Sequence, residues 1–525
     1  MAQQWWRNAA IYQVYVRSFA DGNGDGVGDL AGVRDRLGHI AELGMDAVWL
    51  TPFYASPMAD GGYDVADYRA VDPLFGQLSD AEALIADAHG LGLRVIVDIV
   101  PNHTSSQHPW FVEALSAEPG SPARERYVFR EGRDGGPPND WESMFGGPAW
   151  TQVADGQWYL HLFDPGQPDL NWQHAEVHAE FESILRFWLD RGVDGIRIDV
   201  AHGLVKADGL PDAKCTDQGG LLTAVELPYF DQDGVHEIYR EWRKILDCYP
   251  GERIGVAEAW VRGADRLALY LRPDELHQAF NFHYAQAEWS AQQFRTTIDD
   301  SLAAVAGVGA ASTWVLSNHD IERHVTRFGG GEPGVRRARA AALLTLALPG
   351  SAYVYQGEEL GLPEVTDLPE EVLADPKWER SGHTERGRDG CRVPIPWSGS
   401  EPPFGFGPSS WLPQPRDWAA LTVEAQRGDP TSTLSLYRDA LLLRRDLPVE
   451  GLEWLESDPD VLAFRRGPSF TCTVNFGSSP VRLPRPGRLL LSSTQEPELE
   501  ANEQTVTLPP SSAAWWTGEE DAHAR

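Results

Sequence analysis

The stretch Gly195-Ile196-Arg197-Ile198-Asp199-Val200 decides the fold and points to the chemistry. Its apolar residues are typical of a short buried β-strand that carries a cation and a carboxylate two residues apart. Because side chains alternate between the two faces of a strand, Arg197 and Asp199 share one face. A paired guanidinium keeps a carboxylate ionised and fixes its direction. We therefore expect an aimed carboxylate at the carboxyl end of a strand, where barrel enzymes carry catalytic groups.

Short apolar runs of this kind recur along the chain, separated by amphipathic segments such as Val177–Arg191 and Gly234–Leu246. The expected strands are Ile11–Val16, Ala47–Leu50, Arg94–Val100, Gly195–Asp199, Ile254–Ala257, Gln278–Phe282, Thr313–Leu316 and Ala352–Tyr355. Alternating strands and helices indicate an α/β protein with a parallel sheet. Eight such units predict a closed (β/α)8 TIM barrel.

Two parts of the chain break this rhythm. Residues 104–174, between the third and fourth strands, are rich in Pro, Gly and Trp and lack clear helical periodicity. After the helix-like Thr433–Arg445, short alternating strands predict an antiparallel β-domain. The predicted organisation is a catalytic barrel of residues 1–103 and 175–446, an inserted subdomain B of residues 104–174 and a C-terminal β-domain of residues 447–525.

Composition excludes several classes of protein. The 525 residues carry a net charge of −34, which argues against binding nucleic acid or an anionic membrane surface. The first residues show no signal peptide, and the most apolar later stretch, Ala340–Leu348, is too short to span a bilayer. The four cysteines have no metal-type spacing. We expect a cytoplasmic protein, and whether it is a monomer or a homodimer stays open.

Polar residues gather where four of the expected strands end. The clusters hold Asp98, Asn102 and His103 after the third strand, Arg197 and Asp199 on the fourth, Glu258 after the fifth, and Asn318, His319 and Asp320 after the seventh. A single acid in such a place is more often a helix cap or a turn residue. Four clusters at one end of a barrel are harder to explain in that way, because buried charges are costly unless they pair or function.

These carboxylates suit the hydrolysis of a glycosidic bond with retention, which needs a nucleophile and an acid/base carboxyl about 5–5.5 Å apart. We assign Asp199 as the nucleophile because Arg197 keeps it charged. Glu258 on the next strand is the expected general acid, kept protonated by negative charge nearby and by partial burial behind Trp260. Asp320 is suited to stabilising an oxocarbenium-like transition state.

The four clusters resemble the signature regions of the α-amylase family, family 13 of the glycoside hydrolases, in the right order. The resemblance spans almost the whole chain, and it implies a barrel, a domain inserted after the third strand and a C-terminal β-sandwich. It gives the same catalytic roles to Asp199, Glu258 and Asp320. It further implies that Asp98 supports Arg197, and that His103 and His319 hold a bound glucose.

Two more stretches resemble the oligo-1,6-glucosidase and α-glucosidase branch of this family: Gly61–Tyr68 and Gln167-Pro168-Asp169-Leu170-Asn171-Trp172. The resemblance places Gln167 in the substrate site, stacks Tyr63 on the glucose ring, and sets Asp60 and Arg388 against the non-reducing-end hydroxyls. An acid and a base at that end would block longer chains, which implies a pocket and exo-action. Phe145 and Phe163 fit either as pocket walls or as subdomain core.

Other residues depart from the patterns of the family. Ala201-His202-Gly203 lacks the Lys-His pair of many α-amylases, which argues against an endo-amylase. Val200, directly after the nucleophile, resembles the residue at this position in enzymes that act on α-1,6 bonds. The segment Arg392–Trp397, in contrast, departs from the oligo-1,6-glucosidase pattern. The preference for one linkage therefore stays open.

The loop Asp21-Gly22-Asn23-Gly24-Asp25-Gly26-Val27-Gly28-Asp29 resembles the calcium-binding loop of the same branch. Alternating side-chain oxygens in a flexible loop suit a hard cation. The alternative is an Asx-rich turn without metal. We expect structural Ca²⁺ and no organic cofactor. The expected ligands are Asp21, Asn23, Asp25, Asp29 and the carbonyl oxygen of Val27.

The sequence thus predicts a retaining exo-acting α-glucosidase that releases terminal glucose from short oligosaccharides such as maltose or isomaltose through a covalent β-glucosyl-enzyme. An α-glucosyl transferase or isomerase, forming trehalose or a sucrose isomer, is the alternative, because the intermediate can also pass to a sugar hydroxyl. A third possibility is a non-enzymatic subunit of a membrane transporter. We consider it less favoured because all three catalytic acids are present.

Overall fold

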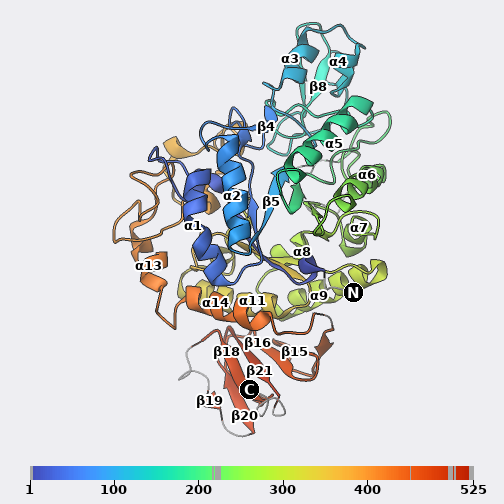
Figure 1. Ribbon diagram of the computed structural model, residues 1–525. Helices are drawn as coiled ribbons and strands as arrows, with labels where there is room; N and C mark the ends of the chain where they lie inside the picture. Colours follow the sequence, from blue (N-terminus) through green and yellow to red (C-terminus); the bar gives the residue numbers. More distant parts are fainter. Residues whose placement is uncertain are drawn as a thin grey trace.

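A parallel eight-stranded sheet forms the centre of the protein in the computed structural model (Figure 1). The structure describes residues 4–215, 218, 226–449, 451–494, 500–501 and 504–518. The strands are β1 (Ala10–Val14), β2 (Ala47–Leu50), β5 (Arg94–Ile99), β9 (Gly195–Ile198), β10 (Ile254–Ala257), β11 (Gln278–Ala279), β12 (Thr313–Val315) and β13 (Ser351–Tyr355). They lie in the order β11-β10-β9-β5-β2-β1-β13-β12. The N–H of Asn281 donates to the carbonyl of Thr313 at 3.2 Å, so the barrel is nearly closed between its two outer strands.

Helices surround this barrel and link its strands (Figure 1). The larger ones are α1 (Leu30–Leu43), α2 (Leu78–Gly90), α5 (Ala175–Leu189), α6 (Val235–Asp247), α7 (Ala264–Leu269), α9 (Ala291–Val308), α11 (Gly331–Ala347) and α14 (Thr433–Arg444). Their ends follow local rules. Asp29 caps α1 by accepting the N–H of Gly32 at 2.7 Å, and Gly44 ends it with φ +93°, a left-handed conformation that favours glycine.

The predicted (β/α)8 barrel is confirmed, and most predicted strands begin and end within a residue of the observed ones. The first and sixth strands are exceptions. The first was predicted to reach Val16 but ends at Val14, and Val16 begins the 3-10 helix η2 (Val16–Ser18). The sixth was predicted to reach Phe282 but ends at Ala279, because Asn281 turns the chain into the short helix α8 (Phe282–Ala285). The side chain of Asn281 accepts the N–H of Tyr284 at 3.0 Å and so acts as the N-cap of this helix.

The segment between β5 and α5 extends from the carboxyl ends of the barrel strands, at the top of Figure 1. It carries the small sheet β6-β8-β7, made of Phe129–Arg130, Trp158–Leu160 and Trp150–Gln152. The segment shows no clear helical periodicity in its sequence, yet it contains two helices. Helices α3 (Pro109–Ser116) and α4 (Pro122–Glu125) lie here, each with proline at its start, where no N–H is needed.

Smaller elements build the rest of the loops at this end of the barrel. Before α2 lies the hairpin β3 (Tyr54–Ala55) and β4 (Asp67–Val71). The long segment between β13 and α14 holds only short helices: η3 (Glu370–Val372), α12 (Pro376–Arg380), η4 (Asp389–Arg392), η5 (Arg416–Leu421) and α13 (Val423–Gln426). Elsewhere lie η1 (Trp5–Arg7), η2 (Val16–Ser18) and α10 (His324–Arg327).

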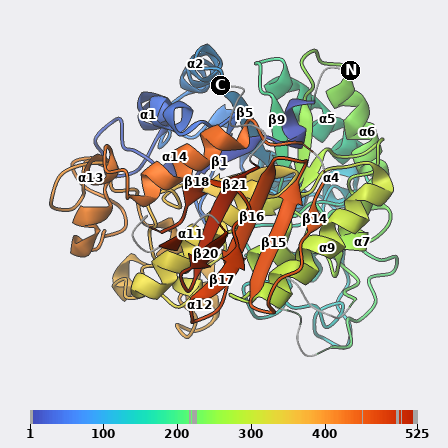
Figure 2. The ribbon, with the colours of Figure 1, turned by 90° about the horizontal axis from the view of Figure 1, so that it is seen from below.

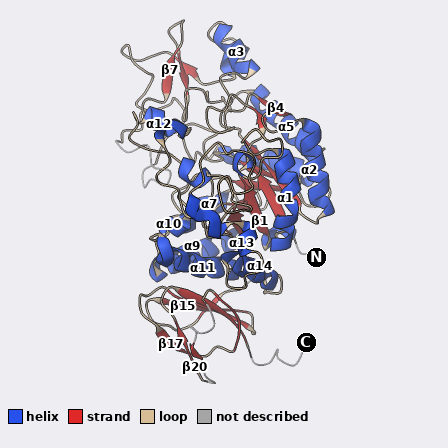
Figure 3. Cartoon of the chain, turned by 90° about the vertical axis from the view of Figure 1, so that its left-hand side faces the viewer, coloured by secondary structure: helices blue, strands red, loops and turns tan. Residues whose placement is uncertain are grey.

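Antiparallel sheets at the end of the chain pack under the opposite face of the barrel (Figures 2 and 3). Their strands are β14 (Glu453–Trp454), β15 (Val461–Arg466), β16 (Phe470–Asn475), β17 (Val481–Pro484), β18 (Arg488–Ser492), β19 (Glu500–Ala501), β20 (Thr505–Leu508) and β21 (Ser512–Thr517). Trp515 on β21 donates to the carbonyl of Leu343 on α11 at 3.0 Å. Residues 519–525, the end of the predicted β-domain, lie outside the described residues. Within the described ranges, every helix is too short or too polar to cross a membrane.

Candidate active site

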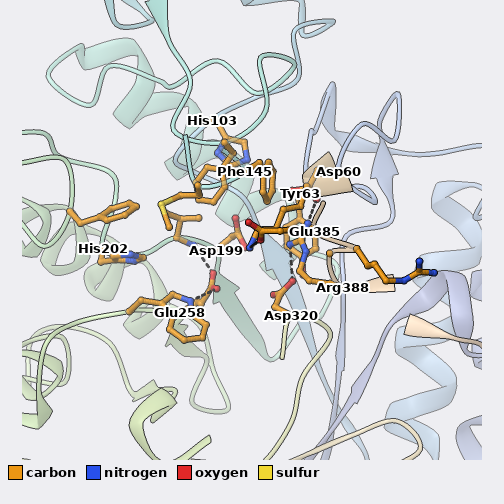
Figure 4. A pocket seen from close by; sticks show the side chains of 18 residues that line it. Asp60, Tyr63, His103, Phe145, Asp199, His202, Glu258, Asp320, Glu385 and Arg388 are labelled. Atoms are coloured by element: carbon orange, nitrogen blue, oxygen red, sulfur yellow. Dashed lines mark hydrogen bonds and ion pairs between the residues drawn. The ribbon is translucent and has the colours of Figure 1, made fainter. Parts of the chain in front are cut away.

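A cavity of about 460 Å³ opens at the carboxyl ends of the barrel strands (Figure 4). It is lined by Asp60, Tyr63, His103, Met144, Phe145, Phe163, Asp199, Val200, His202, Phe230, Glu258, Trp260, Asp320, Lys377, Glu385, Arg386, Gly387 and Arg388. Most of the predicted site residues are among them. Asp98, Gln167, Arg197 and His319 lie behind this surface, bonded to residues that line it.

Strand register places Arg197 at the centre of the catalytic carboxylates. On the neighbouring strands it is paired with Asp98 of β5 and Val256 of β10. Its Nη1 donates to Asp98 Oδ1 at 2.8 Å and to Asp199 Oδ1 at 2.6 Å. Its Nη2 lies 2.8 Å from Glu258 Oε2, an ion pair without the alignment of a hydrogen bond. One buried guanidinium thus holds the predicted nucleophile, the predicted acid and a supporting carboxylate.

Burial dominates the protonation of this cluster. It raises the pKa of Asp98 to about 7, although Arg197 opposes the change. It also raises the pKa of Asp199 well above its usual range, with the charge of Glu258 acting in the same direction. The prediction that Arg197 simply keeps Asp199 charged is therefore incomplete. Three carboxylates that face one cation share protons, and such a group can carry the proton that general acid catalysis needs.

Glu258 is fixed by two N–H donors. Its Oε1 accepts the indole N–H of Trp260 at 2.9 Å, and its Oε2 accepts the backbone N–H of Val200 at 2.8 Å. The ring of Trp260 stacks on Phe282 with centroids 3.6 Å apart. Val200 has φ +45°, a left-handed conformation that costs a β-branched residue on the order of 1–3 kcal/mol. This strained turn directly after the nucleophile aims a peptide N–H at the acid.

A second guanidinium gathers carboxylates at the other end of the cavity (Figure 4). Arg388 Nη2 donates to Asp60 Oδ1 at 2.7 Å, and its Nη1 donates to Asp320 Oδ1 at 2.9 Å. Its Nε donates to Asp375 Oδ2 at 2.5 Å. Arg392 also donates to Asp320 at 2.9 Å. Burial would raise the pKa of Asp320, but His319, Arg388 and Arg392 hold it well below its usual range.

The remaining predicted polar residues form a chain of contacts behind the cavity. Gln167 Nε2 lies 3.1 Å from Asp60 Oδ2 and 3.0 Å from His103 Nε2. Burial lowers the pKa of His103 to about 4, so its imidazole is neutral. Tyr63 donates to Asp98 at 3.1 Å and stacks on His319 with centroids 5.2 Å apart. One face of Tyr63 is therefore covered by His319.

Apolar side chains form the wall that subdomain B contributes. The ring of Phe145 meets that of Phe163 edge to face at 5.7 Å, and Phe163 lies 5.2 Å from the ring of His103. Both phenylalanines line the cavity, as one of their two predicted roles requires. The guanidinium of Arg388 lies over the ring of Phe145 at 5.1 Å, so this wall reaches the second arginine.

Sequence reasoning assigned no role to Asp375, Arg392 or His202. Asp375 lies thirteen residues before Arg388 in a segment without periodicity, and only the fold brings the two together. One local signal was present, since Asp375 directly precedes a proline and therefore reads as a helix N-cap. It does cap α12, accepting the N–H of Lys377 at 2.9 Å.

The loop predicted to bind calcium satisfies its oxygens internally. Asp21 accepts the N–H groups of Gly24 at 2.6 Å and Gly26 at 2.9 Å, and Asp25 accepts that of Val27 at 2.9 Å. Asn23 Oδ1 accepts the N–H of Asp25 at 2.9 Å. Across the part of the chain that the structure describes, no three acidic, histidine or cysteine residues gather as metal ligands. Each carboxylate oxygen keeps a second lone pair, so the donor set still suits a hard cation, and Ca²⁺ stays a prediction.

The fold and this site define a class of protein: a (β/α)8 carbohydrate-active enzyme with three acids at the carboxyl ends of its strands. Residues 13–450 match the alpha amylase catalytic domain, and residues 455–515 match a domain of unknown function, DUF3459. The chain belongs to the α-amylase family, family 13 of the glycoside hydrolases, and is a glycoside hydrolase enzyme.

Curated relatives cover most of the chain. A probable alpha-glucosidase of Rhizobium meliloti (strain 1021) is 40% identical over 484 residues, which are 88% of this chain and 87% of that protein. An oligo-1,6-glucosidase of Parageobacillus thermoglucosidasius is 35% identical over 507 residues, 89% of each protein.

Solved structures of similar fold include glucosyl transfer enzymes. The alpha-glucosyl transfer enzyme XgtA superposes with a TM-score of 0.89 at 36% identity, covering 98% of this chain and all of that one. The trehalulose synthase MutB from Pseudomonas mesoacidophila MX-45 superposes with a TM-score of 0.90 at 31% identity and the same coverage. Hydrolases and glucosyl transfer enzymes thus share this architecture.

Proposed function

We propose that this protein is a retaining, exo-acting α-glucosidase that removes terminal glucose from short α-glucosides of the maltose or isomaltose type. The observation that carries the proposal is the pair of arginine clusters in one cavity. Arg197 joins Asp199 to Glu258, and Arg388 joins Asp60 to Asp320. The Arg388 cluster closes one end of the cavity, which leaves room for a terminal sugar rather than for a continuing chain.

The first chemical step would use both catalytic acids. Glu258 donates the proton retained by the Arg197 cluster to the glycosidic oxygen, while Asp199 attacks the anomeric carbon from the opposite side. The bond between that carbon and the glycosidic oxygen breaks, and the leaving sugar departs with the proton. Asp320, kept negative by two arginines, stabilises the positive charge that develops on the sugar ring.

The second step would return the enzyme to its starting state. The ionised Glu258 takes a proton from a water molecule, whose oxygen attacks the anomeric carbon and displaces Asp199. Two inversions give glucose with its original α configuration. A sugar hydroxyl in place of the water would give a transfer product instead. The alternative proposal of a glucosyl transferase or isomerase therefore needs no different acids, and it is supported by the names of XgtA and MutB.

A product time course separates these two proposals. We suggest incubating the purified protein with maltose, isomaltose, trehalose and sucrose at low and high concentration, with all products resolved over time. Free glucose as the main product from maltose or isomaltose supports the hydrolase. A disaccharide isomer or a longer glucoside as the main early product supports the transferase. Failure to act on any of the four, with an aryl α-glucoside also left intact, contradicts both.

For the loop from Asp21 to Asp29 we propose a bound Ca²⁺ held by Asp21, Asn23, Asp25, Asp29 and the Val27 carbonyl. It would stabilise the start of α1, which Asp29 caps, and take no part in catalysis. A chelator should lower the melting temperature and added Ca²⁺ should restore it. An unchanged melting temperature in both conditions contradicts the site. The cytoplasmic location and the number of subunits stay predictions.

A further inference from the structure

Arg380 joins the loop after β13 to subdomain B, across 234 residues of sequence. It is the last residue of α12, and its Nε donates to the carbonyl of Gly146 at 2.9 Å. Its Nη2 donates to the same carbonyl and, at 3.4 Å, to that of Pro148. Arg380 itself lies outside the set of described residues that line the cavity. Any effect on a substrate must therefore pass through the residues that it holds.

The turn that Arg380 holds carries part of the cavity wall. Gly146 and Gly147 have φ values of +96° and +73°, a left-handed conformation that favours glycine. The N–H of Gly146 donates to the carbonyl of Ser143 at 2.8 Å, and the N–H of Ser143 donates to the carbonyl of Gly147 at 2.8 Å. Phe145 lies inside this turn and lines the cavity. Because Arg380 binds the carbonyl of the very next residue, it fixes the backbone from which the phenylalanine ring projects.

The other end of α12 holds Arg388. Asp375, the N-cap of this helix, accepts the Nε–H of Arg388 at 2.5 Å. The guanidinium of Arg388 lies over the ring of Phe145 at 5.1 Å, and both residues line the same cavity (Figure 4). From Asp375, α12 leads to Arg380 and so back to the Phe145 turn. The contacts thus form a closed ring, and one short helix positions both walls at this end of the cavity.

The chemistry of a guanidinium suits this link. Hydrogen bonds from a charged donor are stronger than those between neutral groups. The planar fork of arginine can also reach two carbonyls of one turn at once, whereas an ammonium has no fixed fork. Loops without such ties are the more mobile parts of a fold. Removal of the donors should therefore loosen the turn at Phe145, and it should leave the catalytic acids around Arg197, at the ends of barrel strands, in place.

We infer that Arg380 is a positioning residue for substrate specificity, which holds the Phe145 turn against Arg388 and keeps this end of the cavity closed around a terminal glucose. The inference rests on the proposed glucosidase function. The substrate class is a glucoside whose glucose is the terminal unit. Arg380 acts on the fit of the wall around that unit, and hence on substrate binding rather than on bond cleavage.

Removal of the two donors tests this role. Arg380→Met keeps the length and the apolar stem of the side chain and removes its hydrogen bonds to subdomain B. We expect KM for maltose or isomaltose to rise about tenfold, because the wall fits the terminal glucose less closely, while kcat changes less than threefold. Arg380→Lys keeps a charged donor and should recover part of the loss. A general loss of structure would instead lower the active fraction, and with it kcat, without this change in KM.

A double-mutant cycle identifies the route. Phe145→Ala removes the ring that Arg380 holds in place, so the addition of Arg380→Met to this variant should change KM less than about twofold. Arg337→Met on α11 is the matched control, because its Nη1 donates to the carbonyl of Phe328 at 2.8 Å, and it should leave KM unchanged. Melting temperatures report folding, and Arg380→Gln replaces the methionine variant if that one does not fold.

Each contrary outcome has a distinct meaning. An unchanged KM in the folded Arg380 variant overturns the inference, as does a loss confined to kcat. Losses from Arg380→Met and Phe145→Ala that multiply overturn it too, because Arg380 would then act by a route other than Phe145. A wild-type protein that cleaves none of maltose, isomaltose and an aryl α-glucoside overturns the proposed function itself, and the inference falls with it.

Discussion

Two arginines of the cavity, Arg197 and Arg388, are each paired with three carboxylates. The two clusters differ in the direction in which the pKa values of their acids are shifted. Arg197 lies on β9 with a side chain 1% exposed, and among the residues that the structure describes it is the single cation paired with Asp98, Asp199 and Glu258. If all three acids were ionised, this cluster would carry a net charge of −2 away from water. Burial accordingly raises the pKa of both Asp98 and Asp199.

The cluster around Arg388 has a second cation. Arg392 shares Asp320 with it, and the side chain of Arg388 is 21% exposed on a long loop rather than on a strand. Burial would raise the pKa of Asp375, but the two arginines lower it to about 2. Two cations face three acids here, and the lowered pKa values keep Asp320 and Asp375 ionised at neutral pH.

The two clusters separate catalysis from substrate binding within one cavity. A general acid must carry a proton into the reaction, and an excess of buried acids over cations supplies it. Carboxylates that bind hydroxyls and stabilise a cation must stay charged, and matched arginines achieve this. The number of cations in each cluster decides the difference, and the predictions below alter one cluster at a time.

The largest effect is expected from the nucleophile. Asp199→Asn keeps an acceptor for Arg197 but cannot form the covalent intermediate, so kcat on an aryl α-glucoside should fall by roughly 10⁴-fold or more. Added azide should restore turnover in Asp199→Ala, because it can enter the vacated space and give β-glucosyl azide. Activity of Asp199→Asn within tenfold of wild type would remove Asp199 from the mechanism and end the distinction between the clusters.

Stability should depend on pH in opposite ways at the two clusters. Between about pH 4 and 7 the folded protein keeps a proton at Asp98 that the unfolded chain has released. The contribution of Asp98 to the free energy of unfolding therefore falls as pH rises. Relative to wild type, Asp98→Asn should therefore gain up to about 1.4 kcal/mol of unfolding free energy per pH unit in this window. Because the three acids are coupled, that figure is the upper limit.

Asp375→Asn provides the contrast. Because the pKa of Asp375 is lower in the folded protein than in the unfolded chain, its ionised form stabilises the fold at every pH above about 3.8. This stability is lost only as pH falls from about 3.8 towards 2. Its deficit against wild type should therefore be flat between pH 4.5 and 7. Urea denaturation of both variants at pH 4.5, 5.5 and 6.5 measures the two slopes. Parallel slopes would mean that the clusters do not differ in their protons.

The third effect concerns geometry rather than charge. Arg388→Lys keeps the cation, but one ammonium cannot bridge Asp60, Asp320 and Asp375 as the planar fork does. We expect kcat/KM for maltose or isomaltose to fall by about 100-fold, with most of the loss in KM. Arg295→Lys on α9, paired with Asp299, is the control and should behave as wild type. An unchanged KM in Arg388→Lys would mean that charge alone holds the terminal sugar.

The two clusters also differ in how far the sequence predicted them. Arg197 lies on β9 and Asp199 directly follows this strand. Asp98 lies near the end of β5 and Glu258 directly follows β10, so strand periodicity and barrel topology were enough to bring the four residues together. Their protonation was not predictable, because it depends on how deeply each acid is buried. The cluster around Arg388 has no such regularity. Asp60 and Arg388 entered through family resemblance, and Asp375 lies in a segment whose path follows from packing rather than from periodicity.

Subdomain B shows the same limit for the fold. Its sequence is rich in proline and glycine and lacks clear helical periodicity, yet Pro109 and Pro122 begin helices, where a missing N–H costs nothing. His202 entered the sequence interpretation only as a departure from the α-amylase pattern, and its packing on Phe230 follows from the fold.

The smallest effect is expected from Asp375, which touches the substrate site only through Arg388. Asp375 accepts both the backbone N–H and the Nε–H of Arg388, at 2.9 Å and 2.5 Å, and Gly387 leaves the space for it, because a Cβ there would lie 2.4 Å from the carboxyl carbon. Asp375→Asn should raise KM about tenfold, while kcat changes less than threefold.

The decisive measurement is the same substitution in the Arg388→Lys background. If Asp375 acts only by positioning Arg388, the double variant should be no worse than Arg388→Lys alone. Two independent losses that multiply would show that Asp375 acts on the site by another route, and the cluster would then not work as a unit.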